Sequence, residues 1–345
     1  MKKNIIALAV ASAIAAPVAM ADAPTVYGQM QLSIDSISYK DTNGDKVQAK
    51  SGSQVNSYNS RVGVKGSADL GNGLKAIYKA EFKVNPDSKE SFENRNQYVG
   101  LAGGFGTVLL GRHDTPYKMA QPKDLFNDAR GDNKPMTGGL GILGNGGENR
   151  VSNVLAYVSP SFGGVKLVGA LVPKEDSGDT SKESSMTDWI SVAAMYGSKK
   201  KGLYLTAAMD SANKALIGDG AGGSAAGDAT QYRLAAQYAV AGLIANAMYQ
   251  DVSGDGAKKE GSNIMLNVGY KMGNLMPKIK YSMNDYKDNA IKDSTGLGLG
   301  VDYALAKKTK VYAEYVSYDK TTYDRKNIGG KASDSAISVG LFHKF

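Results

Sequence analysis

The chain has 345 residues, of which 42% are hydrophobic and 21% are charged, and its formal net charge is +8. This composition is typical of a folded protein, and the absence of cysteine excludes a disulfide framework and a thiolate zinc site. Only two histidines are present, so we expect no transition-metal site and no cofactor.

Residues 1–21 are predicted to be a secretory signal peptide. A positively charged start is followed by an apolar run at 5–16 and an Ala-x-Ala cleavage motif at 19–21. The alternative is a membrane anchor, but the run is short for a spanning helix and Pro17 interrupts it. Cleavage leaves the domain 22–345 and removes two lysines, so Lys+Arg falls from 41 to 39 against 33 Asp+Glu, a net charge of +6. With no other spanning helix, the exported chain is a soluble protein or a membrane β-barrel.

The rest of the chain alternates strand-like segments of about ten residues with turn signals and shows no helical period. Short turns are predicted at seven places: 70–73, 103–106, 162–164, 199–202, 240–242, 273–276 and 305–308. Longer polar connections are predicted at eight places: 39–56, 85–92, 115–149, 173–186, 212–228, 253–261, 287–293 and 320–334. These fifteen connections predict sixteen strands, with short turns at one end and long loops at the other, as in outer-membrane barrels.

Apolar and polar residues alternate within the predicted strands. In 231–240, 263–272 and 296–305, one face is largely apolar, and the other consists mostly of polar residues, glycine or alanine. This pattern predicts a barrel with an apolar outer face and a polar, water-filled interior. A soluble β-sandwich also alternates, so the pattern alone does not separate the two folds.

Aromatic residues stand just before the short turns and at the chain end: Tyr98, Tyr157, Tyr196, Tyr238, Tyr270, Tyr303 and Phe345. A fixed distance from the turns predicts a ring of aromatic side chains at one height, which is the interfacial girdle of a membrane barrel. Scattered tyrosines of a soluble β-protein need no such spacing. We therefore expect a transmembrane barrel.

Several segments resemble the general-diffusion porins of Gram-negative bacteria: Thr-Val-Tyr-Gly at 25–28, the runs at 60–76, 94–101 and 105–112, Tyr-Val-Ser-Pro at 157–160, and Phe345. The resemblance implies an all-β, sixteen-stranded antiparallel barrel in the bacterial outer membrane, assembled as a homotrimer among lipid and lipopolysaccharide. It also implies that barrel-assembly machinery reads Phe345 as an assembly signal and that the third long loop folds into the lumen.

The longest predicted connection is 115–149, and an irregular loop of this length is usually functional. The resemblance implies that it narrows the pore. Its acids and bases are equal in number: Asp124, Asp128, Asp132 and Glu148 against Lys118, Lys123, Arg130 and Lys134. The loop therefore does not make the pore cation-selective by itself. We expect the constriction acids Asp124, Asp128 and Asp132 to face basic groups on the wall.

Five of the seven arginines lie in 61–150, on or beside the strands that flank this loop. Strand parity predicts four inward basic residues: Arg61, Lys65, Lys75 and Arg150. The resemblance adds Arg95. Crowded guanidinium groups stay charged, so such a basic wall predicts a weak preference for anions. The alternative is that these residues are ordinary polar groups of the lumen with no role in selectivity.

Three motif-like patterns are rejected. Gly-x-Gly-x-x-Gly at 139–144 lacks the flanking strand and helix of a nucleotide site. The acidic spacing at 41–52 departs from an EF-hand loop at its glycine and glutamate positions. The pair His113 and Asp114 comes without a nucleophile signature. Because the lysines are spread along the chain, no nucleic-acid partner is expected.

The sequence therefore predicts an outer-membrane porin and not an enzyme: a water-filled channel for passive diffusion of small hydrophilic solutes and ions. Three alternatives stay open, namely a substrate-specific porin for phosphate, organic acids or sugars, a soluble secreted β-protein or adhesin, and an outer-membrane enzyme. Aromatic side chains along the lumen favour sugars, and clustered lysines favour phosphate.

Overall fold

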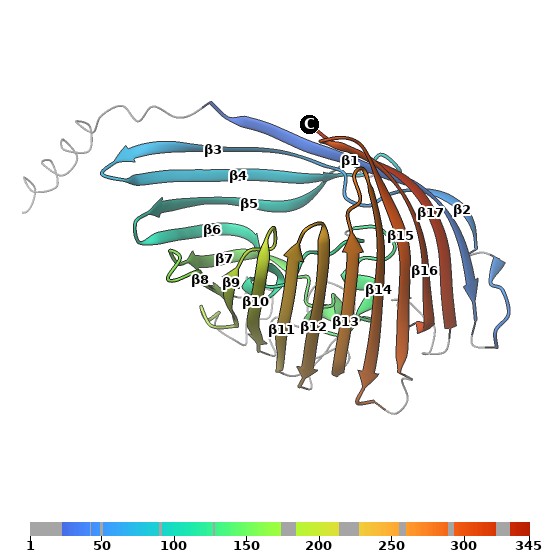
Figure 1. Cartoon of the computed structure of the whole chain (residues 1–345). Helices are drawn as coiled ribbons and strands as arrows, with labels where there is room; N and C mark the ends of the chain where they lie inside the picture. The colour runs from blue at the N-terminus through green and yellow to red at the C-terminus, as the bar shows by residue number, and fades with distance from the viewer. Residues whose placement is uncertain are drawn as a thin grey trace, which may run out of the picture.

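A computed structural model describes residues 23–41, 43–48, 51–89, 92–126, 128–173, 184–213, 228–254, 260–288, 293–321 and 332–345. These residues form a barrel of antiparallel strands (Figure 1). The expected signal peptide lies outside the described residues. Within them, no helix is long and apolar enough to cross a membrane.

In the described residues, the wall consists of seventeen strand segments: β1 (Thr25–Lys40), β2 (Gly52–Ser57), β3 (Arg61–Gly71), β4 (Leu74–Val84), β5 (Phe92–Gly103), β6 (Gly106–Asp114), β7 (Arg150–Val158), β8 (Val165–Val172), β9 (Trp189–Gly197), β10 (Gly202–Ala212), β11 (Ala229–Val240), β12 (Leu243–Ser253), β13 (Gly261–Tyr270), β14 (Leu275–Tyr286), β15 (Ser294–Ala306), β16 (Thr309–Thr321) and β17 (Ala332–Lys344). From β3 onward, each strand pairs with the next one in the sequence.

Strand β1 closes the barrel. One of its edges pairs with β17, and the other pairs with β2 over 32–37 and with β3 over 25–29. β2 and β3 are therefore two halves of one wall strand. Between them, the Ser60 hydroxyl takes a place in the ladder by accepting a hydrogen bond from the Gln31 backbone N–H at 2.9 Å. The predicted sixteen-stranded antiparallel barrel is confirmed.

Short and long connections alternate along the chain as predicted, and the strand ends that they join lie at opposite ends of the barrel (Figure 1). The first long loop is shorter than the predicted 39–56, because β1 continues to Lys40 and β2 starts at Gly52. In this loop the Asp41 carboxylate accepts the backbone N–H groups of Asn43 at 2.8 Å and Asp45 at 3.0 Å. This local turn accounts for the acidic spacing that resembles the start of an EF-hand.

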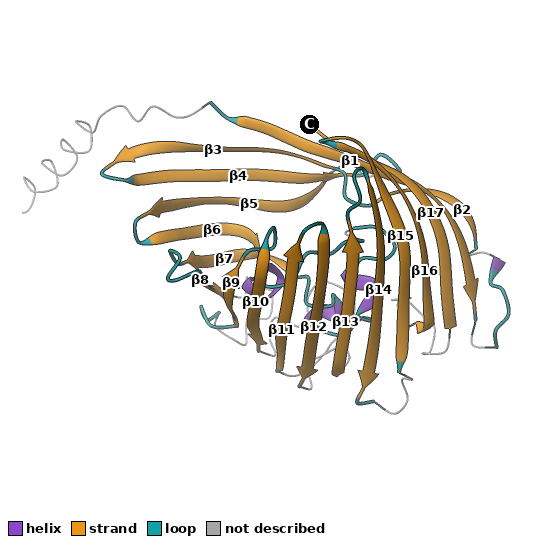
Figure 2. Ribbon diagram, viewed as in Figure 1, coloured by secondary structure: helices purple, strands orange, loops and turns teal. Residues whose placement is uncertain are grey.

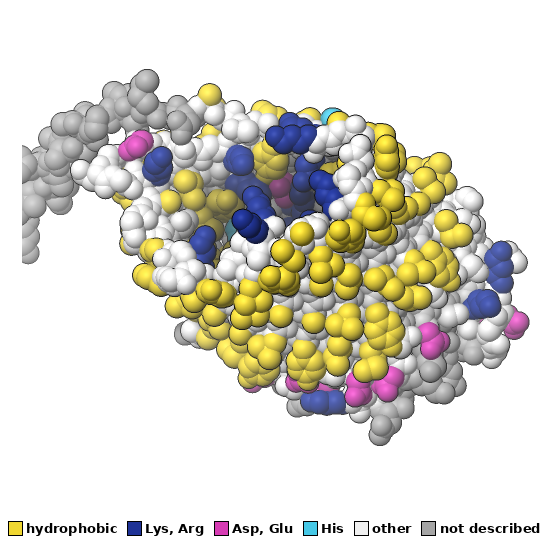
Figure 3. Space-filling view, viewed as in Figure 1, with side chains coloured by type: hydrophobic (Ala, Val, Ile, Leu, Met, Phe, Trp, Pro, Cys, Tyr) yellow, Lys and Arg dark blue, Asp and Glu magenta, His cyan; other side chains and the backbone are white. Residues whose placement is uncertain are grey.

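The outer face of the barrel is apolar and the inner face is polar, as the alternation predicts. The outward residues Leu234 and Ile264 are 57% and 41% exposed, whereas the inward residues Gln231 and Asn263 are fully buried. Figure 3 shows hydrophobic side chains covering much of the outer wall. Such a surface is stable where lipid, rather than water, surrounds it.

Six of the seven predicted girdle residues are exposed on the outer face: Tyr157, Tyr196, Tyr238, Tyr270, Tyr303 and Phe345. The prediction for Tyr98 is wrong. Tyr98 pairs with Lys79 on the inner face, and its ring centre lies 5.3 Å from that of His113. A bulge earlier in β5 changes the parity of this strand, so that Val99 points outward instead.

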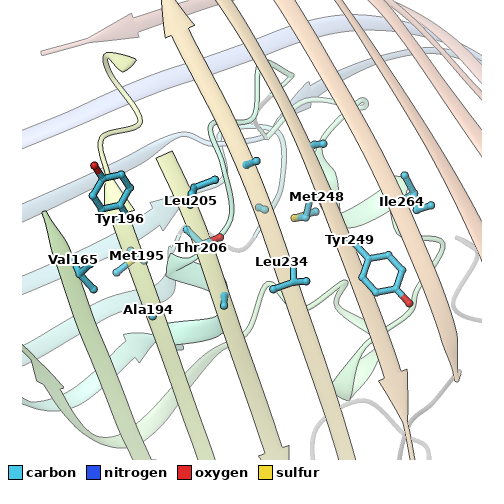
Figure 4. A pocket seen from close by; sticks show the side chains of 14 residues that line it. Val165, Ala194, Met195, Tyr196, Leu205, Thr206, Leu234, Met248, Tyr249 and Ile264 are labelled. Carbon is cyan, nitrogen blue, oxygen red and sulfur yellow. The ribbon is translucent and has the colours of Figure 1, made fainter. Parts of the chain in front are cut away.

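Small side chains hollow the outer wall across β8 to β13. The resulting groove has a volume of about 670 Å³, and alanines from four strands contribute to its lining. Larger side chains, among them Tyr196, Leu234 and Tyr249, border it (Figure 4). The lining is almost entirely apolar, so this groove belongs to the membrane-facing wall and not to the pore.

The 115–149 loop lies inside the barrel and carries three short helical segments: α2 (Pro116–Met119), α3 (Asn133–Met136) and η2 (Ile142–Gly144). Figure 2 shows helical segments and loops behind the strands of the front wall. The loop residues Tyr117, Met136 and Ile142 are buried against inward side chains of the strands. The fold implied by the resemblance, with this loop inside the lumen, is confirmed.

Candidate functional site

The loop is attached to the wall from its first turn. Pro116 at the start of α2 fixes a backbone angle that suits a helix. The Tyr117 backbone N–H donates to the Ser191 hydroxyl of β9 at 3.1 Å, and the Thr206 hydroxyl of β10 donates to the Ala120 carbonyl at 2.7 Å. The chain that leaves β6 is therefore directed across the lumen.

Arg233 of β11 holds the two ends of the loop together. Its guanidinium donates to the Tyr117 carbonyl at 2.9 Å and to the Gly146 carbonyl at 3.0 Å. It also donates to the Gln250 side chain of β12 at 3.1 Å. Arg233 is only 1% exposed, so its charge is used to hold the loop rather than to attract solutes.

Lys280 of β14 anchors the middle of the loop. Its ammonium donates to the Gly131 carbonyl at 2.8 Å and to the Asn133 side chain at 2.9 Å, and it forms an ion pair with Asp124. Asp124 also accepts the backbone N–H groups of Phe126 and Asn133. This acid was predicted to face basic groups on the wall at the constriction. Its basic partner is Lys280 and not one of the predicted wall residues, and the pair is buried in the attachment of the loop.

Arg130 ties the loop to the strands that close the barrel. Its guanidinium pairs with Asp334 of β17 at 2.7 Å, and the Tyr318 hydroxyl of β16 donates to the Arg130 carbonyl. Together with the contacts to β9, β11 and β14, these bonds stretch the loop across the lumen. The loop therefore narrows the channel.

A cluster of charges on the inner wall is centred on Glu81 of β4. The cations around its carboxylate are Arg95 at 2.7 Å, Lys79 at 3.2 Å and Arg61 at 3.9 Å. The Tyr27 hydroxyl donates to the same carboxylate at 2.9 Å. Three cations around one carboxylate leave an excess of two positive charges. We call Arg61, Lys79, Glu81 and Arg95 the wall cluster.

A β-bulge in β5 points Arg95 into the lumen. The β4–β5 register places Ala80 opposite Gln97 and Phe82 opposite Asn94, so both Arg95 and Asn96 lie opposite Glu81. A bulge of this kind re-aims a side chain and breaks the simple alternation of the strand. This explains why strand parity alone left the direction of Arg95 undefined.

A second charged group adjoins the wall cluster through this bulge. Asp114 at the end of β6 pairs with Arg150 at 2.9 Å and with Lys118 at 3.4 Å. The Asn96 side chain donates to Asp114 at 3.1 Å and accepts from Arg150 at 2.7 Å. Two cations against one carboxylate leave one further positive charge.

Asp128 is the loop acid that interacts with the wall cluster. Burial raises the pKa of its carboxyl, and the positive charges of Arg95, Lys118 and Arg61 oppose that rise. The Asp128 backbone N–H donates to the Asp132 carboxylate at 3.2 Å. The part of the loop that carries Asp128 therefore faces the basic side of the lumen.

Asp132 and Glu148 are two further buried carboxyls of the loop. Burial raises the pKa of both groups, and the negative charge of Glu148 raises the pKa of Asp132 further. The charge of Asp128 acts on both in the same direction. These carboxyls therefore hold protons under conditions in which an exposed carboxyl has lost them.

The predicted wall residues lie at different levels of the barrel. Arg61 and Arg95 belong to the wall cluster, and Arg150 belongs to the adjoining group. Lys65 lies directly opposite Lys79 in the β3–β4 register, and the ammonium groups of the two lysines lie 5.5 and 5.7 Å from the centre of the Tyr27 ring. Lys75 lies next to the short turn between β3 and β4. Lys65 therefore adjoins the wall cluster, whereas Lys75 is nearer the short-turn end than the cluster.

Sequence reasoning gave no role to Glu81, Arg233 or Lys280. The parity of β4 contained a signal for Glu81, because this residue shares a face with Lys75 and Lys79. Arg233 and Lys280 occupy ordinary inward positions of alternating strands. Their partners are loop carbonyls and a loop carboxylate, which only the folded loop brings to them.

Comparison with known proteins relates the chain to channels of bacterial outer membranes. Residues 7–323 match the protein family described as Gram-negative porin. The major outer membrane protein P.IB of Neisseria lactamica is 28% identical over 360 residues, covering 100% of both chains. The solved anion-selective porin from Comamonas acidovorans matches with a TM-score of 0.76 at 22% identity, over 94% of this chain and 99% of that chain. OmpT of Vibrio cholerae in its trimer form matches with a TM-score of 0.66 at 19% identity, over 94% and 100%.

Proposed function

Because the chain belongs to the Gram-negative porin family, and so forms a diffusion channel in the outer membrane, we propose that this channel weakly prefers small anions. The observation that carries the proposal is the excess of positive charge in the wall cluster, where Arg61, Lys79 and Arg95 surround one carboxylate. The likeness to a porin whose description is anion-selective supports the same preference.

The constriction acts on solutes through its shape and its field. The attached loop limits the size of what passes. The positive wall cluster interacts with the negative Asp128 of the loop, so a field runs between the wall and the loop and orients water and polar solutes. Fixed positive charge raises the local concentration of anions, which then diffuse through faster than cations of similar size.

Reversal potentials in planar bilayers under a KCl gradient test this preference. We expect the sign that reports faster passage of chloride, and we expect Arg61→Gln with Arg95→Gln to move the potential toward cation preference. Lys287→Gln is the control, because this lysine is 53% exposed and pairs at 3.8 Å with Glu260, among residues of the long-loop end. An unselective native channel, or an equal shift in the control, contradicts the proposal.

Three further features of the family are proposed for this chain. We propose that residues 1–21 are removed, so that N-terminal sequencing of the membrane protein starts at Asp22. We propose that the protein assembles as a homotrimer in contact with lipid and lipopolysaccharide. The trimeric form of the similar OmpT supports this assembly. Light scattering in detergent, corrected for bound detergent, would then give three chains per particle. We also propose that assembly machinery recognises Phe345.

A further inference from the structure

A polar cavity opens at the short-turn end of the lumen. It has a volume of about 680 Å³ and is lined by residues 121–125 of the loop together with strand ends and a turn. Figure 3 shows a hollow at this end of the molecule, with Lys and Arg side chains around its opening. Neither the arginines nor the glutamate of the wall cluster lines this cavity.

Five lysines line the cavity: Lys123, Lys199, Lys200, Lys310 and Lys344. Two carboxylates also line it, which leaves three uncompensated positive charges. Both carboxylates already have partners behind the lining. Asp124 pairs with Lys280, and Asp302 pairs with Lys278 at 2.8 Å as well as with Lys310 at 2.6 Å. We call this space the lysine cavity.

Side chains of the wall strands contact four of these five lysines. The Gln237 side chain accepts the Lys123 backbone N–H at 2.8 Å and donates to the Lys199 carbonyl at 2.7 Å, which fixes the loop and the β9–β10 turn relative to each other. Two further ammonium groups lie near the Phe342 ring, that of Lys310 at 5.7 Å and that of Lys344 at 5.3 Å from the ring centre. The backbone at Lys123 and Lys199 and the ammonium groups of Lys310 and Lys344 are therefore positioned before any ligand arrives, which lowers the entropy cost of binding.

Crowding of these cations is visible at Lys123. Burial lowers the pKa of its ammonium, and the positive charges of Lys310 and Lys344 lower it further. Burial, together with the charge of Arg233, lowers the pKa of Lys199 to about 8. An anion in the cavity would relieve this repulsion and stabilise the protonated ammonium groups.

We propose that the lysine cavity binds multivalent oxyanions of the phosphate class. Ammonium groups are compact point charges with three donors each, and several of them converging from separate strands suit a ligand with several charged oxygens. Chloride carries one charge and offers fewer contacts, so the cavity discriminates in favour of the multivalent anion. The site depends on the proposed channel for access but not on the selectivity of the wall cluster.

Calorimetric titration of the detergent-solubilised protein with pyrophosphate tests the site. We expect saturable binding by each chain, weakened about tenfold or more for each of Lys123→Gln and Lys344→Gln. Lys287→Gln, which removes a lysine from the long-loop end, leaves the affinity unchanged. The heat-dependent gel mobility of folded barrels verifies that every variant is assembled.

Equal affinity in the native protein and in the Lys123→Gln and Lys344→Gln variants would overturn the proposal, as would an equal loss in Lys287→Gln. The KCl-gradient reversal potential separates this site from the function proposed above. Specific pyrophosphate binding in an unselective channel refutes the anion preference alone. Anion preference without specific pyrophosphate binding refutes the lysine cavity alone.

Discussion

The guanidinium carbon of Arg233 lies 4.2 Å from the centre of the Tyr117 ring, in a position where both side chains are almost fully buried. The same guanidinium donates to the carbonyl of Tyr117 and to that of Gly146 near the other end of the loop. One cation from the barrel wall therefore holds a loop whose two ends are far apart in sequence. The position of the loop in the lumen therefore depends on this contact.

Arg233→Met is expected to loosen the loop and enlarge the channel. The Tyr117 and Gly146 carbonyls lose their donor, at a cost of about 1–3 kcal/mol for each group left without a partner. Single-channel recordings should show a higher mean conductance and more open-channel noise, and thermal unfolding should occur at a lower temperature. Arg233→Lys keeps the charge and should give a smaller change. A native conductance in Arg233→Met contradicts the anchoring role.

Lys280→Met is expected to destabilise the barrel because it leaves Asp124 buried without a cation. Breaking a buried pair from one side costs about 3–5 kcal/mol. Adding Asp124→Asn should recover part of that loss, since the uncompensated charge is removed. Unfolding free energies of the two single variants and the double variant test the coupling. Strictly additive effects would show that the two side chains do not act as a pair.

The barrel could be predicted from the sequence because each wall strand repeats one simple pattern. Residues such as Leu234 and Gln231 alternate between lipid and lumen, and turn residues mark where each strand ends. The bulge opposite Glu81 breaks this pattern. It turns Tyr98 inward, against the prediction, and leaves the direction of Arg95 open to sequence reasoning.

The constriction was predictable only in part, because its contacts join residues that are distant in sequence. Loop acids could be counted, but their partners could not be known before the loop was folded. Lys280 of the wall balances Asp124, whereas Asp114 and Asp334 of the wall balance Lys118 and Arg130. The equal count of acids and bases in the loop therefore does not describe the charge that the loop presents to the pore. Asp128 is the predicted acid that interacts with the arginines of the wall.

Acidification is expected to increase the preference for anions. The pKa of Asp128, Asp132 and Glu148 is raised, so these groups gain protons at a higher pH than ordinary carboxyls, which titrate near 4. As pH falls toward that value, the loop loses negative charge while the arginines keep theirs. Reversal potentials between pH 7.5 and pH 4.5 should therefore shift toward anions.

The same carboxyls link stability to pH with a defined sign. A raised pKa means that the folded state binds these protons more tightly than the unfolded state. The resulting stabilisation is fully present at a pH below the pKa of the unfolded state, and it is lost as the pH rises through the pKa of the folded state. Asp132→Asn with Glu148→Gln should raise the melting temperature at pH 7.5 more than at pH 4.5. It should also flatten the pH dependence of selectivity. A variant that melts lower at pH 7.5 than the native protein disagrees with this sign.

The terminal aromatic residue is expected to matter for assembly more than for barrel stability. Phe345 pairs with Gly28 through backbone hydrogen bonds of 3.1 and 3.4 Å, and a Cβ at position 28 would overlap its ring. Phe345→Ala keeps the backbone bonds but removes the ring proposed as the assembly signal, so the fraction of folded protein in outer membranes should fall several-fold. Leu341→Ala is the control, because it removes a lipid-facing side chain from β17, the strand that ends just before Phe345, and this side chain is about equally exposed. Equal yields of heat-modifiable protein from the two variants would refute the special role of Phe345.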